Sequence, residues 1–397
     1  MKSINIKKLY NYSAYIMILL LFFSKGLPNV MLIILSVLFL INFDSKIFKI
    51  NYSAKTILLV LLLYLTIKSL FYGNLPFDFK IYKGLLLLLW ISVLLYKIED
   101  IKTLKLVVLM SINACILVSL FLIARFYFQT GILPFSNTAE VNNLLLLERP
   151  YIGFVAVLGF LIAIEKAISF SNWRWIYSIN SLALLAFIIL ISARISIITI
   201  FFIAGIYFLF YFKTKWYKKI LCALSLLILF LIIVVSNKNI SERFFIKSDF
   251  EKSMQEASDY EPRIVIWHCA YDMTQNNEFN RITGFEGYQI IKNNFLSCYE
   301  SSIENESKKQ YFLSEKFNSH NQFIDLYLVG GILALLLFIV FFVKLFYEVK
   351  NDFIATSIVI SFLFFFLVEN IFYRQFGCYL FGIFIFKLIP PKRINNE

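Results

Sequence analysis

The sequence predicts an all-α integral membrane protein with about twelve transmembrane helices and one large extracytoplasmic, mainly helical loop between spans 9 and 10. Hydrophobic residues make up 60% of the 397 residues and charged residues only 16%, which is typical of membrane proteins with several spans. Apolar runs near the roughly 20 residues that cross a bilayer core recur along most of the chain. Only one segment, residues 237–320, is both long and polar.

Twelve apolar stretches are close to the length of a transmembrane helix. Their approximate limits are 10–23, 28–43, 55–73, 84–97, 104–127, 151–169, 175–193, 195–212, 219–236, 322–346, 353–371 and 375–389. The stretches 175–193 and 195–212 are separated by a single charge, Arg194. One helix over both would extend about 48 Å at ~1.5 Å per residue, well beyond a bilayer core of about 30 Å. We therefore expect two spans that meet in a tight turn at Arg194.

The basic residues predict an orientation. With a cytoplasmic N-terminus, the inside segments hold 20 of the 38 lysines and arginines, the short outside segments hold 8, and residues 237–320 hold the other 10. This excess follows the positive-inside rule and places both termini in the cytoplasm. The net charge of +13 is then explained by basic anchors at the lipid surface, and it implies no nucleic-acid partner.

The chain therefore divides into three parts. Residues 1–236 hold transmembrane helices 1–9, residues 237–320 form an external loop domain, and residues 321–397 hold transmembrane helices 10–12 and a short cytoplasmic tail.

The loop domain is expected to be helical and ordered. Pro262 stands where a first helical position would be, and apolar or aromatic residues then recur at spacings of three and four. These residues are Ile264, Trp267, His268 and Tyr271. Gly284 and Gly287 break the helix, and a polar helical stretch leads back to His320. Packing beside Trp267 explains His268. Cys269 and Cys298 could form a disulfide in an oxidising compartment, and the sequence leaves this open.

Several kinds of chemistry are disfavoured. The chain has two histidines and no cysteine cluster, so an ordinary zinc site is not expected. It has no phosphate-binding glycine loop, no dinucleotide fingerprint and no Asp-x-Asp pair in its outer loops. We therefore expect a reaction that needs no metal and no cofactor and uses a substrate already activated in the membrane.

The residues suited to chemistry gather on the predicted outer side. They are His320, Arg194, Arg263, Arg149 and Arg374. Arginine suits a diphosphate because its planar fork donates paired, charge-assisted hydrogen bonds, and histidine can accept a proton from a hydroxyl near neutral pH. Each has a plainer alternative, since arginine also anchors helices at the lipid interface and His320 also suits a helix start. Arg194 is the arginine that apolar residues flank most closely, which favours function there.

The arrangement resembles the O-antigen ligase and O-antigen polymerase superfamily. Four motifs carry the resemblance in order: "SARIS" with Arg194, "RIVIW" with Arg263 and Trp267, "TGFEGY" with Gly284 and Gly287, and "SHNQFIDLYLVGG" with His320, Asn321 and Gly330. "LVENIFYRQFG", with Glu369 and Arg374, resembles the acidic turn after the next span. The glycine turn departs from the family, because Gly-Phe-Glu-Gly is longer than the usual Gly-x-Gly.

The resemblance implies glycan transfer from undecaprenyl diphosphate on the periplasmic face of a bacterial inner membrane, without metal or nucleotide. The donor would be an undecaprenyl-diphosphate-linked glycan, and the acceptor would be lipid A-core or a growing glycan. Arg194, Arg263 and His320 would be catalytic. Asn321, Trp267, Arg149, Arg374 and Gly284 would bind substrate.

Two alternatives remain open. A repeat-unit polymerase would use the same lipid-linked donor, and only the His-Asn pair favours a ligase. A non-enzymatic transporter of lipid-linked sugar is disfavoured, since such proteins tend to place charged or helix-breaking residues near mid-membrane in paired halves.

Overall fold

The computed structural model describes residues 2–43, 54–134, 138–169, 172–236 and 262–389, and regular structure within these ranges is helical. The helices are α1 (Lys2–Leu20), α2 (Leu27–Ile41), α3 (Ala54–Phe71), α4 (Leu75–Tyr96), α5 (Ile101–Thr130), α6 (Thr138–Leu144), α7 (Arg149–Ser169), α8 (Arg174–Leu190), α9 (Arg194–Ile206), η3 (Tyr207–Tyr211), α10 (Trp216–Ser236), α13 (Pro262–Thr274), α14 (Tyr288–Ser302), α15 (Glu306–Glu315), α16 (Gln322–Val349), α17 (Phe353–Phe366), η4 (Ile371–Tyr373), α18 (Gln375–Ile383) and η5 (Phe384–Leu388).

The all-helical membrane architecture is confirmed. Each of the twelve predicted apolar stretches overlaps a described helix. Six segments are long and apolar enough to cross a membrane: α3, α4, α5, α7, α9 with η3, and α16. The shorter apolar segments are α2, α8, α17 and α18 with η5. Twelve spans therefore remain a prediction.

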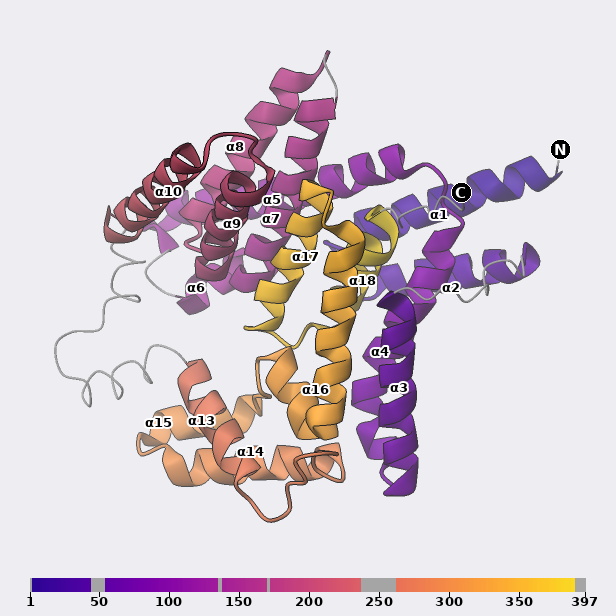
Figure 1. The fold of residues 1–397 in the computed structure, drawn as a ribbon, viewed down its shortest axis with the longest axis vertical. Coiled ribbons are helices and arrows are strands. Elements are labelled where there is room, and N and C mark those ends of the chain that lie inside the picture. Colours follow the sequence, from indigo (N-terminus) through magenta and orange to yellow (C-terminus); the bar gives the residue numbers. More distant parts are fainter. Residues whose placement is uncertain (1, 44–53, 135–137, 170–171, 237–261, 390–397) are drawn as a thin grey trace.

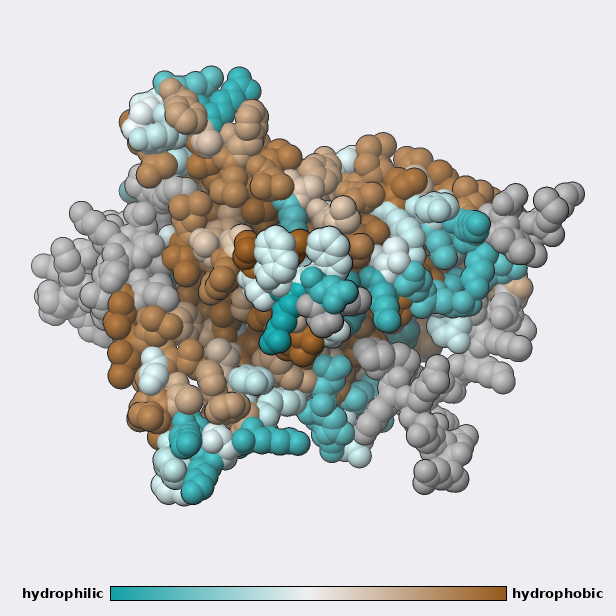
Figure 2. Space-filling view, turned by 90° about the horizontal axis from the view of Figure 1, so that it is seen from above, coloured by the Kyte–Doolittle hydropathy of each residue, from teal (hydrophilic) through white to brown (hydrophobic). Residues whose placement is uncertain are grey.

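The C-terminal helices lie at the centre of the molecule. α16 packs against α3, α18 against α4, and α17 against α7 and α9. The three C-terminal helices therefore lie between α3 and α4 on one side and α7 and α9 on the other (Figure 1). Aromatic rings fill these contacts, including Phe154 of α7 stacked on Phe365 of α17 with ring centroids 4.2 Å apart. Seen from above in that orientation, hydrophobic side chains cover much of the surface and hydrophilic ones gather in a few clusters (Figure 2).

The predicted break at Arg194 is confirmed. α8 ends at Leu190 and α9 begins at Arg194, with Ser192 between them in the left-handed region at φ 52°. Gly153 of α7 allows this turn to pack closely, because a Cβ at position 153 would stand 2.5 Å from the Cβ of Ala193. The turn is therefore fixed against α7.

The part of the loop segment that the structure describes, from residue 262 on, contains three helices, α13 (Pro262–Thr274), α14 (Tyr288–Ser302) and α15 (Glu306–Glu315), which lie together below α16 (Figure 1). A disulfide joins Cys269 of α13 to Cys298 of α14. The expectation for His268 was wrong, because its side chain is 66% exposed and pairs with Asp272 at 3.0 Å. The predicted apolar face of α13 was also wrong, since the helix buries a different set: Ile266, Cys269, Ala270 and Met273.

A kink divides α16 at its glycine pair. Gly331 adopts φ 62° and ψ −161°, a conformation that is essentially open only to glycine. The turn over residues 281–285 fits against the kink. Its Phe285 amide donates to the Leu328 carbonyl at 2.9 Å, and its Arg281 carbonyl accepts from the Ile332 amide at 2.9 Å.

Helix α3 completes the hydrogen bonding at the kink. Lys68 donates to the carbonyls of Phe285 and Val329, and the Tyr64 hydroxyl donates to the Gly330 carbonyl at 2.9 Å. Backbone groups freed by a break in an apolar helix are costly unless they find partners. The turn and α3 supply those partners, so α13–α15 are attached directly to the membrane helices.

Candidate functional site

Glu369 lies at the centre of a charged cluster between the loop helices and the end of α17. Its side chain is buried, and its Oε1 accepts a hydrogen bond from Nη2 of Arg263 at 3.1 Å. The same oxygen lies 3.6 Å from Nδ1 of His320. Arg263 is further fixed by a hydrogen bond from its Nε to the Val368 carbonyl at 3.1 Å. One carboxylate thus joins two of the three predicted catalytic residues.

The surroundings of Glu369 favour its charged form. Burial would raise its pKa, but the neighbouring imidazole of His320 and the charges of Arg263 and Arg374 hold the pKa below the ordinary value. The distance from Nδ1 to Oε1 is too long for a hydrogen bond, but a carboxylate charge beside the ring stabilises the imidazolium that forms when a histidine accepts a proton. The arrangement therefore suits His320 to act as a base.

His320 has a backbone conformation that its neighbours must enforce. Its φ is 43°, in the left-handed region that costs a non-glycine residue about 1–2 kcal/mol. The Asn318 side chain accepts a hydrogen bond from the His320 amide at 3.2 Å, and the ring of Phe317 lies 5.5 Å from the imidazole. Strain of this kind is often found at functional sites.

Asn321 connects the start of α16 to the end of α17. Its Oδ1 accepts from the amides of Phe323 at 2.9 Å and Ile324 at 3.1 Å, which caps the helix. Its Nδ2 donates to the Leu367 carbonyl at 3.0 Å. These bonds give Asn321 a structural role immediately beside His320.

Trp267 holds the same loop from the other side. The indole Nε1 donates to the Ser319 carbonyl at 3.0 Å, one residue before His320. Arg263 and Trp267 are four residues apart on α13, so one helical face supplies both contacts.

Arg374 and Arg149 lie where α7 begins. Arg374 donates from Nη1 to Oε1 of Glu148 at 2.5 Å, and its guanidinium lies 4.8 Å from the ring centre of Tyr151. Arg149 is buried, and its amide donates to the Asn142 side chain at 3.0 Å. Arg374 also lies close enough to Glu369 to lower its pKa, so Arg374 borders the Glu369 cluster.

The other two predicted residues have different surroundings. Gly284, at φ 75°, contacts the α16 kink, where a Cβ would stand 2.5 Å from the Leu328 carbonyl oxygen. This close contact accounts for a glycine at position 284. Arg194 begins α9 beside α7. That Arg194 and Arg263 meet on one diphosphate stays a prediction.

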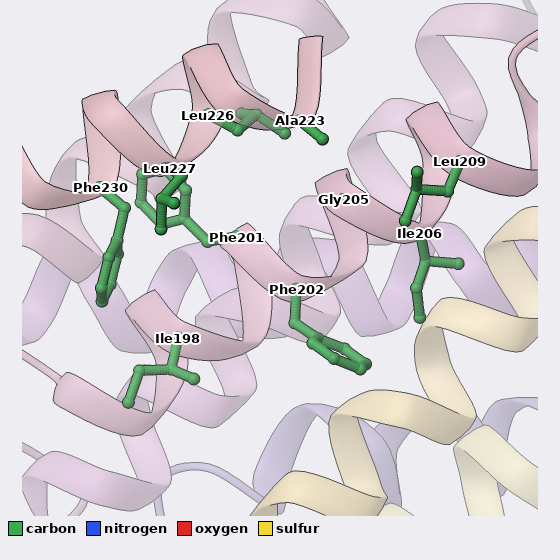
Figure 3. A pocket seen from close by; sticks show the side chains of 10 residues that line it. All are labelled: Ile198, Phe201, Phe202, Gly205, Ile206, Leu209, Ala223, Leu226, Leu227 and Phe230. Carbon is green, nitrogen blue, oxygen red and sulfur yellow. The ribbon is translucent and has the colours of Figure 1, made fainter. Parts of the chain in front are cut away.

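An apolar groove of about 320 Å³ runs between α9 and α10 (Figure 3). Its lining consists of Ile198, Phe201, Phe202, Gly205, Ile206, Leu209, Ala223, Leu226, Leu227 and Phe230. The α9 residues follow Arg194 along the same helix. The groove presents almost no polar group, so it suits a hydrocarbon chain and not a sugar or a phosphate.

Sequence reasoning did not place Glu369, Asp325 or Glu148 in the site. Glu369 accepts a hydrogen bond from Arg263, and Glu148 accepts one from Arg374. Asp325 accepts one from Ser319, the residue before His320. The signal was present for two of them, because Asp325 and Glu369 are acidic residues inside strongly apolar stretches, where an ionisable group favours a functional role.

One comparison with known proteins covers part of this cluster. The model of the O-antigen ligase family matches residues 179–339, a range that includes Arg194, Arg263 and His320. No curated protein matches the chain. The match confirms the resemblance to the O-antigen ligase superfamily.

Proposed function

We propose that the protein is an O-antigen ligase-like glycosyltransferase that moves a glycan from undecaprenyl diphosphate to a hydroxyl of lipid A-core on the periplasmic face of the inner membrane. The observation that carries the proposal is the cluster of His320 and Arg263 on the buried carboxylate of Glu369. It combines a base with a phosphate-binding cation where the loop helices meet the apolar helices.

The reaction follows from these side chains. Nε2 of His320 accepts the proton of the acceptor hydroxyl while the hydroxyl oxygen attacks the anomeric carbon. The bond from that carbon to the diphosphate oxygen breaks, and its electron pair leaves with the diphosphate. Attack opposite the leaving group inverts the anomeric configuration. The energy comes from the lipid diphosphate, so the reaction requires no nucleotide, and the arginines take the role that a metal ion would otherwise have at the leaving group.

The arginines account for the leaving group. Negative charge grows on the diphosphate as the glycosidic bond breaks, and fixed guanidinium groups stabilise it. Arg263 is positioned for this by Val368 and Glu369, and Arg194 is the second candidate. Trp267, Asn321, Arg149, Arg374 and Gly284 are proposed to shape or border the substrate site. The groove along α9 and α10 fits the hydrocarbon chain of such a donor.

The test is transfer by the purified, lipid-reconstituted protein supplied with a lipid-linked glycan and an acceptor. His320→Ala should lower the rate by about a hundredfold or more, because positioned general bases contribute at least that much. His268→Ala is the matched control, since the only other histidine is exposed on α13 and pairs with Asp272. Near-normal transfer by His320→Ala would reject the base, and absence of transfer by the unaltered protein would favour a transporter.

A polymerase that joins repeat units remains the second candidate, because the family match fits both reactions. Deletion of the gene separates them. A ligase predicts undecorated core with accumulated lipid-linked polymer, whereas a polymerase predicts lipopolysaccharide that carries a single repeat unit.

A further inference from the structure

A buried polar network lies directly behind the proposed catalytic cluster. At its centre is Asp325, which is 2% exposed in the first turn of α16. Its Oδ1 accepts from Nδ2 of Asn370 at 3.1 Å and lies 3.3 Å from Oγ of Ser319. Its Oδ2 accepts from the Tyr373 hydroxyl. Asn370 also donates to Oγ of Ser319 at 2.9 Å, which closes the network.

Each partner of Asp325 is the chain neighbour of a residue in the proposed site. Ser319 precedes His320, Asn370 follows Glu369, and Tyr373 precedes Arg374. These three segments come from the end of the loop domain and from the turn after α17. One carboxylate therefore sets the distances between their backbones.

We propose that Asp325 is a positioning residue, which holds His320, Glu369 and Arg374 in their relative places through Ser319, Asn370 and Tyr373. The inference deepens the proposed function and rests on it. The left-handed backbone of His320 supports this role, because a strained conformation persists only where surrounding contacts enforce it. The fixed hydrogen bonds of Ser319 supply that constraint.

The conservative variant is Asp325→Asn, which keeps the shape of the side chain. Its amide nitrogen cannot accept a hydrogen bond, so either Asn370 or Tyr373 can no longer donate to residue 325. Asp78→Asn is the matched control. Asp78 is also a buried carboxylate, and it accepts from the Tyr288 amide at 2.7 Å, but its partners are not neighbours of the site residues.

In the transfer assay, Asp325→Asn should lower kcat at least tenfold and change the KM for the donor less than threefold. Asp78→Asn should change kcat less than threefold, even if it lowers the thermal stability equally. In a His320→Ala background, Asp325→Asn should cost less than in the unaltered protein, because the part of its effect that acts through His320 is lost with that side chain. Equal losses in both backgrounds would overturn the proposal.

A second measurement does not require activity. The Trp267 indole is bonded to the Ser319 carbonyl, so its fluorescence reports the position of this loop once Trp90, Trp173, Trp175 and Trp216 are replaced by phenylalanine. Asp325→Asn should shift the emission to the red and raise quenching by acrylamide, and Asp78→Asn should not. An unchanged spectrum would overturn the positioning role. A shifted spectrum from a protein without transferase activity would instead reject the proposed function alone.

Discussion

At the residue scale, the proposed site depends on an unequal balance of charge. The four arginines proposed for it, Arg149, Arg194, Arg263 and Arg374, stand against two glutamates, Glu148 and Glu369, that pair with members of the group. The carboxylates orient the cations and leave a positive surplus. Such a surplus suits a dianionic group such as a diphosphate.

The fork of Arg263 provides a direct test. Arg263→Lys keeps the positive charge but cannot donate in parallel to the Val368 carbonyl and the Glu369 carboxylate, because an ammonium is a point donor. We expect the kcat/KM of transfer to fall about tenfold or more, which corresponds to about 1.4 kcal/mol of lost transition-state stabilisation.

Arg281→Lys is the control for Arg263→Lys, since Arg281 belongs to the same loop domain and its side chain is exposed. Transfer should stay within twofold for this variant. An equal fall in both variants would mean that the loss reflects a general disturbance of the loop domain and not the fork of Arg263.

At the element scale, the kink of α16 and the turn over residues 281–285 depend on each other. Gly331 needs a turn to bond the freed amides of Ile332 and Leu333, and Gly284 needs a kinked helix to approach. The sequence predicted a helix break at Gly284 and named Gly330 only as part of a family motif. It could not pair them, because nearly fifty residues separate the turn from the kink and neither motif encodes its partner.

Other elements also differ in whether the sequence alone could predict them. The break at Arg194 was predictable, because bilayer thickness limits the length of an apolar helix. The buried face of α13 was not, because its spacing allowed two faces and the Cys269–Cys298 disulfide selects one. The role of Glu369 required the fold, since its partners Arg263 and His320 come from other segments.

The close fit of the turn at Gly284 against the kink at Gly331 predicts a large loss of stability when a methyl group is added at position 331. Gly331→Ala would place a Cβ 2.2 Å from the Ile282 carbonyl oxygen at a backbone conformation closed to alanine. We expect the protein to lose about 3 kcal/mol or more of stability from strain and overlap, seen as a lower midpoint of thermal unfolding in detergent.

Gly205→Ala is the matched control, because Gly205 lies in helix α9 with no atom within 4 Å of an added Cβ. Its midpoint should be unchanged or slightly higher, since alanine favours helix. If Gly331→Ala unfolds at the same temperature as Gly205→Ala, the turn does not lock the kink.

At the scale of the whole molecule, the loop helices and the membrane helices form one assembled unit. Lys68 bonds both the turn and the kink, and Asn74 donates to the Glu286 carbonyl at 3.2 Å. These contacts lie on the same side as the Glu369 cluster. The proposed site is therefore assembled from the loop domain, the start of α16 and the turn after α17.

This assembly makes the predicted orientation testable. Glu315 at the end of α15 is exposed near the proposed site, and Asn351 is exposed between α16 and α17, after the long apolar helix has ended. In a chain with Cys222→Ser, whose other free thiols Cys115 and Cys378 are buried, a cysteine at 315 should react in intact cells with a thiol reagent that cannot cross the inner membrane. A cysteine at 351 should react only after lysis.

The disulfide gives an independent measure of the same orientation. A periplasmic loop domain should be isolated with Cys269 and Cys298 oxidised, because disulfides persist in oxidising compartments and are rare in the cytosol. In cells that lack periplasmic thiol oxidation, Cys298, which is only partly buried, should become reactive, whereas the buried Cys269 should react only after denaturation. Labelling of position 351 and not 315 in intact cells, with both thiols reduced in normal cells, would place the loop domain in the cytoplasm. The donor would then have to present its glycan on that side, which would contradict the proposed transfer to lipid A-core on the periplasmic face.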